Sequence, residues 1–145
     1  MFSHILIPTD GSPFSDKAID MGLALAQSLG GRVSILTVSP PFHVLTTDTM
    51  SLSDTKENYA ADAEKRANAI FKPGLDRANA LGVAADSKHV FHDHAYEAII
   101  NAAAQNGCNL IVMASHGRRG IAGLLLGSET TKVLTHSKIP VLVCR

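Results

Sequence analysis

The residues best suited to bind an anion lie in the segment 114–117, Ala-Ser-His-Gly, and at Gly127 and Ser128 further along the chain. An apolar run directly precedes this segment and predicts a buried strand, and the amphipathic pattern after Ser128 predicts a helix. The first N–H groups of a helix have no intrahelical partners and carry partial positive charge. A strand, a glycine-bearing loop and a helix start in that order therefore predict a phosphate site, to which Arg118 and Arg119 would add charge.

A second polar loop, Thr-Asp-Gly-Ser at 9–12, follows the first apolar run of the chain. Its carboxylate, Asp10, can hold Mg²⁺ against bound phosphates or accept hydrogen bonds from sugar hydroxyls. The alternative is an ordinary turn aspartate, since this composition favours turns in any case. His116 can contact ribose or phosphate, and Val38 and Met113, at the ends of their strands, can flank a flat base or belong to the core.

Apolar runs of strand length alternate with helical patterns along the whole chain. Pro73 and Gly74 predict a kink or break within one long helix, because proline removes a helix hydrogen bond and clashes with the preceding turn. The polar segment 42–53 is longer than a typical connection and predicts a loop long enough to cover a site. We expect strands at 4–8, 33–38, 87–91, 110–113 and 140–144, and helices at 13–29, 54–81, 95–105 and 128–136.

This alternation predicts a single doubly wound α/β domain, with a five-stranded parallel sheet of order 3-2-1-4-5 and helices on both faces. In such sheets, ligands bind beyond the carboxyl ends of the strands, where the strand order reverses. That point lies between the first and fourth strands. Asp10 and Gly117 follow these two strands, so we expect their loops to meet at one crevice.

The composition fits one globular domain over residues 1–145 and excludes several classes of function. Apolar residues make up 46% of the chain, too many for a disordered protein. Lys and Arg together number 13, as do Asp and Glu, so no broad basic face is expected to bind nucleic acid. No apolar run approaches the ~20 residues that span a bilayer, so no membrane partner is expected either.

The two cysteines, Cys108 and Cys144, lie beside apolar runs without any pattern. Reduced, buried and structural thiols are therefore expected, which favours a cytoplasmic protein. The segment 1–8 has no basic stretch or cleavage site, so it predicts a first strand rather than a signal peptide.

Three histidines, His89, His92 and His94, are candidate ligands for zinc, copper or nickel. His89 and His92 are three apart in a predicted strand region and should point to opposite faces, so surface histidines are the favoured interpretation. No Ser-His-Asp order or paired-carboxylate arrangement indicates a hydrolytic site.

The glycine spacing resembles the nucleotide loop of the universal stress protein family, G-x2-G-x9-G-[ST]. Gly117, Gly127 and Ser128 match this pattern, and Ala114 stands at its first glycine. The similarity extends over the chain, from the Ile-Leu-Ile-Pro-Thr-Asp-Gly-Ser run at 5–12 to the Pro-Val-Leu-Val run near the end. The resemblance implies the adenine nucleotide alpha hydrolase-like fold of the ATP-binding members of that family.

The resemblance also implies a set of nucleotide contacts, with ATP, ADP or AMP as ligand and Mg²⁺ held through Asp10. Glu129 differs from the apolar residue usual at its position, so it could weaken phosphate binding or help to hold Mg²⁺. Together with His116 and Arg118 of the same loop, the expected contacts are Pro8, Thr9, Asp10, Val38, Met113, Ala114, Gly117, Gly127, Ser128, Glu129 and Thr130.

The function implied by the resemblance is that of an ATP-binding regulatory protein in stress tolerance, with slow hydrolysis at most. Members typically form homodimers through the last strand, here Val141–Cys144, whose apolar edge favours pairing with a second copy. One alternative is an ATPase or adenylyl-transferring enzyme that uses the same crevice, with Asp10, Ser128 and Mg²⁺ as its working groups. The other is a nucleotide-free dimeric scaffold, which Ala114 and Glu129 would favour.

Overall fold

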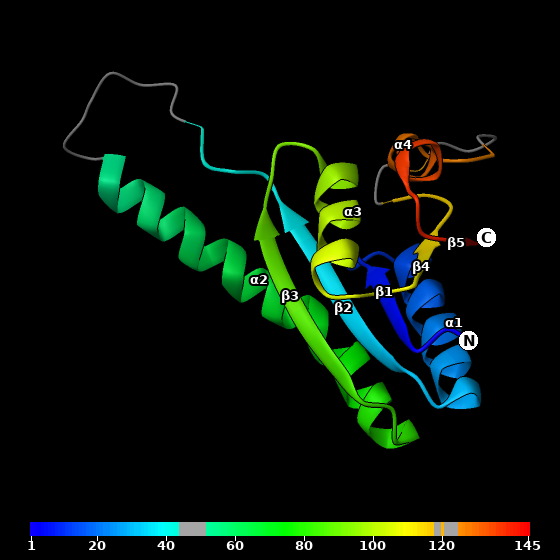
Figure 1. Ribbon diagram of the computed structural model, residues 1–145. Helices are drawn as coiled ribbons and strands as arrows, with labels where there is room; N and C mark the ends of the chain where they lie inside the picture. Colours follow the sequence, from blue (N-terminus) through cyan, green and yellow to red (C-terminus); the bar gives the residue numbers. More distant parts are fainter. Residues whose placement is uncertain (44–51, 118–119, 121–124) are drawn as a thin grey trace.

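The structure, a computed structural model, describes residues 1–43, 52–117, 120 and 125–145. The strands are β1 (His4–Pro8), β2 (Arg32–Ser39), β3 (Ala85–Phe91), β4 (Leu110–Ala114) and β5 (Val141–Cys144), and the helices are α1 (Pro13–Leu29), α2 (Leu52–Leu81), α3 (Ala95–Gln105) and α4 (Ser128–His136). All strand pairs are parallel, and the order in the sheet is β3-β2-β1-β4-β5. The predicted doubly wound α/β fold is therefore confirmed (Figure 1).

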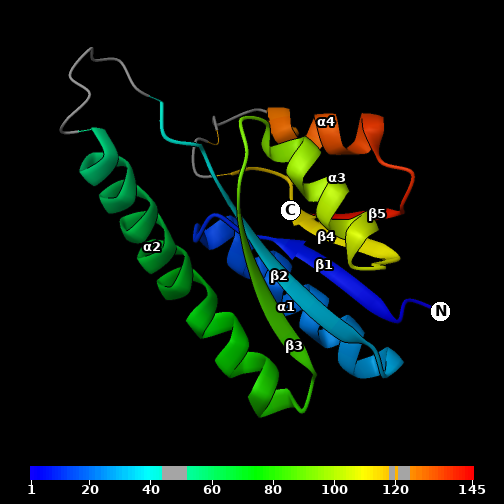
Figure 2. The same ribbon diagram turned by 60° about the vertical axis from the view of Figure 1, so that its left-hand side comes forward.

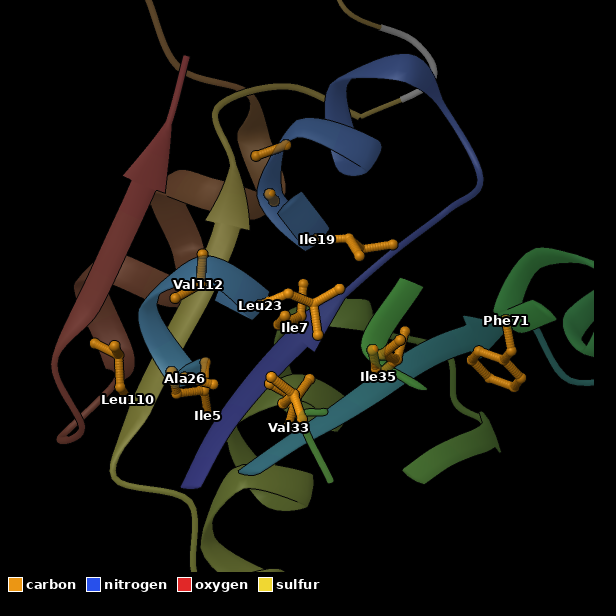
Figure 3. Packing of buried hydrophobic residues seen from close by; sticks show 14 of the residues in the cluster. Ile5, Ile7, Ile19, Leu23, Ala26, Val33, Ile35, Phe71, Leu110 and Val112 are labelled. Atoms are coloured by element: carbon orange, nitrogen blue, oxygen red, sulfur yellow. The ribbon is translucent and has the colours of Figure 1, made fainter. Parts of the chain in front are cut away.

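Alternating side chains of the strands divide the core between the two faces of the sheet. Ile5 and Ile7 of β1 face one side, where they pack with Leu23 of α1 and with residues of α2 (Figure 3). Leu6, between them, faces the other side and packs with Ile99 of α3. In Figure 2, α3 accordingly lies in front of the strands and α1 behind them. Burial on both faces is what a parallel sheet requires.

Helix α1 begins and ends at local signals that the sequence contains. The Ser12 hydroxyl oxygen accepts a hydrogen bond from the N–H of Ser15 at 3.3 Å, and the proline that follows Ser12 fits the first helical position. Gly30 ends the helix with a φ of 66°, which favours glycine. Within the helix, Gly22 allows close packing on the sheet, because a Cβ there would come within 2.3 Å of Cδ1 of Ile7.

Helix α2 differs from its prediction in two ways. It begins at residue 52 rather than 54, and it continues through Pro73 without a break. The turns around the proline are packed on the sheet. Phe71 and Ala78 belong to the core, and a Cβ on Gly74 would come within 2.8 Å of Cδ1 of Ile35. Of the predicted kink or break, the break was wrong, because this packing outweighs the local penalty of an interior proline.

Smaller differences concern the ends of other elements. Strand β3 begins at residue 85, two residues before the predicted start. The predicted loop at 42–53 falls largely on residues 44–51, outside the described part of the chain, so its covering role stays a prediction. No helix among the described residues is long and apolar enough to cross a membrane.

Candidate functional site

Hydrogen bonds within the turn between β1 and α1 hold Asp10 in place. Its Oδ1 accepts from the N–H of Ser12 at 2.9 Å and from the hydroxyl of Ser15 at 3.1 Å. The hydroxyl of Thr9 donates to Oγ of Ser15 at 2.9 Å and accepts from the N–H of Gly11 at 3.1 Å. The carboxylate is thereby positioned at the carboxyl end of β1.

The loop after β4 is tied to the first turn of α4. The N–H of Gly127 donates to the carbonyl of Ser115 at 2.7 Å. The hydroxyl of Thr130 donates to the carbonyl of Ala114 at 2.9 Å and to that of Ser115 at 3.3 Å. The N–H of Ser115 donates in turn to the carbonyl of Cys144 in β5 at 2.7 Å. Because Thr130 and Ser115 are both buried, these bonds form a rigid frame around the start of α4.

These two loops, far apart in the sequence, meet at the carboxyl ends of β1 and β4. A Cβ on Gly117 would come within 3.1 Å of Oδ2 of Asp10. A Cβ on Gly127 would lie 3.9 Å from the backbone nitrogen of Gly117. Asp10 and Gly127 therefore lie at the same end of the molecule, as the crevice between the first and fourth strands requires.

A cavity of about 160 Å³ opens where the two loops meet. Its apolar lining comes from β1, β2, α3 and β4, and its polar lining comes from the two loops and the first turns of α1 and α4. The lining residues are Pro8, Thr9, Asp10, Ser15, Leu36, Val38, Ala95, Ile99, Met113, Ala114, His116, Gly117, Glu129 and Thr130.

Most of the residues expected at a nucleotide site line this cavity, but Gly127, Ser128, Arg118 and Arg119 are not among its described lining residues. Gly127 and Ser128 lie at the start of α4 and are not among the lining residues. The N–H of Gly127 already donates to Ser115, so a phosphate would instead have to reach the N–H groups that follow it. Arg118 and Arg119 lie outside the described residues.

Four lining residues were missed by the sequence analysis: Ser15, Leu36, Ala95 and Ile99. Ala95 and Ile99 are four apart on α3 and so share one face of the helix, a spacing that is visible in the sequence. What the sequence does not reveal is that this face meets the ends of β1 and β4, because that depends on how α3 packs across the sheet.

Ala114, which stands where the nucleotide-loop pattern has its first glycine, is compatible with a backbone close to a ligand. Every described residue with a positive φ is a glycine, so Ala114 has a negative φ that a side chain adopts without strain. The residue is 8% exposed and is part of the cavity wall. The substitution therefore adds a small group to the wall and does not distort the loop.

His116 contributes a polar atom whose hydrogen bonding is incomplete. Its Nδ1 lies 3.0 Å from the hydroxyl of Ser115, and its ring centroid lies 6.1 Å from that of Phe14. Its Nε2 is buried and has no hydrogen-bond partner within the described part of the chain. Leaving a buried polar atom unpaired costs about 1–3 kcal/mol, so a polar ligand group that reached Nε2 would be favoured.

Glu129 connects the beginnings of two helices at the edge of the cavity. Its Oε2 accepts a hydrogen bond from the N–H of Tyr96 in α3 at 2.9 Å, and its Oε1 lies 3.5 Å from Nζ of Lys132. Of the cavity-lining residues that the structure describes, those with an Asp, Glu, Lys or Arg side chain are Asp10 and Glu129. The described wall of the cavity therefore carries two carboxylates.

Comparison with known proteins identifies the family. The sequence model described as the universal stress protein family matches residues 1–145. The chain belongs to this family. The universal stress protein YxiE of Bacillus subtilis (strain 168) is 32% identical over 149 residues, covering 100% of both chains.

Two solved structures extend the comparison to the fold of this universal stress protein. The protein MJ0577 superposes with a TM-score of 0.84 at 25% identity, covering 99% of this chain and 95% of that one. A universal stress protein in complex with cAMP has a TM-score of 0.72 at 28% identity, covering 99% of this chain and 97% of that one. The fold predicted from the alternation of strands and helices is thus also the fold of known family members.

Of the three neighbouring histidines of this universal stress protein, His92 and His94 contact each other and His89 contacts Ser39. Nε2 of His89 lies 2.8 Å from the hydroxyl of Ser39, and burial lowers the pKa of His89. Nδ1 of His92 accepts a hydrogen bond from the N–H of His94 at 2.9 Å. Among the residues that the structure describes, no group of three or more His, Cys, Asp or Glu side chains is arranged to hold a metal ion.

Both cysteines are free thiols, as expected, but only Cys108 is buried, whereas Cys144 is partly buried. Burial raises the pKa of the Cys108 thiol to about 11, so this thiol is uncharged at neutral pH. A neutral, buried thiol is a poor nucleophile and a poor metal ligand, which leaves Cys108 with a packing role.

Proposed function

We propose that this universal stress protein binds an adenine nucleotide in the cavity between the ends of β1 and β4. ATP is the ligand that we place there first, with ADP and AMP as alternatives. Nucleotide occupancy then sets the shape or the partners of the protein in stress tolerance, and any hydrolysis is slow.

The close approach of Gly117 to Asp10 is the observation that carries this proposal. A Cβ on Gly117 would lie 3.1 Å from Oδ2 of Asp10, so a side chain at this position would crowd the carboxylate. Bare backbone at this point allows a ligand to approach the main chain closely. A carboxylate facing that backbone suits sugar hydroxyls, or a Mg²⁺ ion bound to phosphates.

The two ends of the cavity suit the two ends of a nucleotide. Leu36, Val38, Ile99 and Met113 line an apolar region that fits a flat base. The start of α4 supplies backbone N–H groups, and its N-cap, Gly127, makes no side-chain cap hydrogen bond. A phosphate group there would satisfy N–H groups of the first helical turn and interact favourably with the helix dipole.

A relative provides independent support for the class of ligand. The universal stress protein that is 28% identical to this chain is in complex with cAMP, which contains adenine, ribose and phosphate. In our proposal Asp10 also holds Mg²⁺ when a nucleotide is bound, because Mg²⁺ commonly binds one or two protein carboxylates together with substrate phosphates. The metal would then offset the negative charge of the cavity wall.

A nucleotide-free scaffold is the second candidate, and the carboxylate of Glu129 in the cavity wall favours it. In either case we propose a homodimer formed through β5. This strand is at the edge of the sheet, and Leu142 within it is 39% exposed. Light scattering should detect a dimer that Leu142→Lys converts to a monomer, and a monomeric wild-type protein would rule this interface out.

The nucleotide proposal is tested by acid extraction of the purified protein and by calorimetric titration with ATP, ADP and AMP, with and without Mg²⁺. We expect a bound adenine nucleotide or a measurable affinity for at least one of the three. No nucleotide in the extract and no heat up to millimolar ATP would exclude nucleotide binding. Rapid turnover of ATP that is lost in Asp10→Ala would instead favour the alternative of an ATPase or adenylyl-transferring enzyme.

Gly117→Ala tests the placement of the ligand. Its methyl group would enter the gap beside Asp10, and we expect affinity to fall at least about tenfold, which corresponds to ~1.4 kcal/mol. Gly107→Ala is the control for losing a glycine away from the cavity, because a Cβ there meets nothing within 4 Å and Gly107 precedes the opposite end of β4. Its φ of 67° strains an alanine, so this variant should lose stability but keep its affinity for the nucleotide. Equal affinities for the wild type and Gly117→Ala would show that the ligand does not pass between the two loops.

A further inference from the structure

The side chain of Glu129 is held in the cavity wall by a contact with another helix. Glu129 is the second residue of α4, and Tyr96, whose N–H donates to Oε2 of Glu129 at 2.9 Å, is the second residue of α3. The N–H groups in the first turn of a helix have no partner within that helix. His94, the N-cap of α3, makes no side-chain cap hydrogen bond. Glu129 therefore supplies this cap from α4.

This cap holds the carboxylate in a defined position. The N-terminal end of α3 carries partial positive charge, which favours a carboxylate beside it. Among the described residues, Lys132 forms an ion pair with Glu129 at 3.5 Å, and the two side chains are 48% and 44% exposed. An ion pair that is open to solvent is weak, so much of the negative charge of Glu129 remains effective towards the cavity.

We propose that Glu129 makes the cavity select nucleotides by the charge of their phosphates. This inference rests on the proposed nucleotide function and refines it. Asp10 and Glu129 line the same cavity, and no lysine or arginine does so among the described residues. Phosphates bound at the start of α4 would lie near the Glu129 carboxylate and be repelled by it. Nucleosides, monophosphates and cyclic phosphates are therefore favoured over metal-free triphosphates.

Glu129→Gln separates this role from the structural one. Glutamine has nearly the same shape and keeps an oxygen that accepts the hydrogen bond from Tyr96, so the cap is preserved while the charge is removed. Glu97→Gln is the matched control. It removes an equal charge from the first turn of α3, but Glu97 does not line the cavity, and its Oε1 accepts from the hydroxyl of Tyr96.

The experiment is calorimetric titration of the wild type and both variants with adenosine, AMP, ADP and ATP without divalent cations. For Glu129→Gln we expect unchanged affinity for adenosine, a gain of about threefold for AMP and a gain of about tenfold for ATP. Salt at 0.5 M should reduce these gains, because it screens charges. Glu97→Gln should change none of the affinities by more than about twofold. Saturating Mg²⁺ should also reduce the gain for ATP.

The outcomes distinguish the inference from the function on which it rests. An equal gain for adenosine and ATP, or no gain for ATP, would overturn the charge selection and leave nucleotide binding in place. Failure of the wild type and Glu129→Gln to bind any of the four ligands would overturn both. The melting temperature of Glu129→Gln should fall by about 1–4 °C, because the amide keeps the hydrogen bond to Tyr96 but loses the favourable interaction with the helix dipole. A purely structural role would change the affinities for adenosine and ATP alike, which would overturn the charge selection.

Discussion

The contact between α1 and β1 at Gly22 gives a prediction whose size follows from the structure. A Cβ on Gly22 would lie 2.3 Å from Cδ1 and 3.0 Å from Cγ1 of Ile7. Carbon atoms in favourable contact are about 3.5–4.0 Å apart, so Gly22→Ala creates a severe overlap. Ile7 is 0% exposed and cannot move its side chain into solvent. The helix must therefore shift away from the sheet, or Ile7 must adopt a strained rotamer.

Two opposing terms set the net effect of Gly22→Ala. Alanine is favoured over glycine in a helix interior by about 1 kcal/mol. Overpacking a core costs about 1–3 kcal/mol, and a 2.3 Å approach corresponds to the upper part of this range. We therefore expect the free energy of unfolding to fall by about 1–2 kcal/mol, which for a domain of this size lowers the melting temperature by about 3–6 °C.

Urea unfolding followed by far-ultraviolet circular dichroism measures this change, since the chain has no tryptophan for fluorescence. Ile7→Val removes the Cδ1 atom that overlaps, and alone it should cost about 1 kcal/mol. If the overlap is the cause, Gly22→Ala with Ile7→Val should lose about 1 kcal/mol less than the sum of the two single losses. Strictly additive losses, or a Gly22→Ala protein as stable as the wild type, would refute this reasoning.

Two further predictions concern stability away from α1. Burial and the Arg32 guanidinium lower the pKa of His4, whose Nε2 lies 2.8 Å from the hydroxyl of Ser34. The unfolded chain therefore binds this proton more readily than the folded chain. The free energy of unfolding should fall as the pH drops below about 6.5, and urea titrations should show a shallower fall for His4→Gln. Thr130→Val removes the hydroxyl that donates to Ala114, so its melting temperature should drop by about 2–6 °C, whereas an unchanged value would show that this bond adds nothing.

The placement of the candidate site was predictable because it depends on general rules of parallel sheets. Asp10 and Gly117 each follow an apolar run, and right-handed crossovers bring the ends of the first and fourth strands together. The structure places these two residues in contact range, at the 3.1 Å measured from a Cβ on Gly117. The apolar ends of β2 and β4, Val38 and Met113, line the same cavity for the same reason.

Tertiary contacts changed the consequence of two local rules. The long helix is not broken at Pro73, because Phe71 and Gly74 pack on the sheet, a contact between segments that are distant in the chain. The N–H of Gly127 donates to the carbonyl of Ser115, so the predicted phosphate contact falls to the N–H groups that follow it and stays a prediction.

The sequence by itself determined the features that depend on residues close together along the chain. These are the alternation of strands and helices, the cap at Ser12 and the glycine spacing after β4, since backbone preferences and periodicity act over a few residues. Only the tertiary structure decided that Glu129 caps α3 and that Ala95 and Ile99 of α3 line the cavity. Hydrogen bonds and charge interactions depend on distances of a few ångströms between side chains, and the packing of whole helices on the sheet sets those distances.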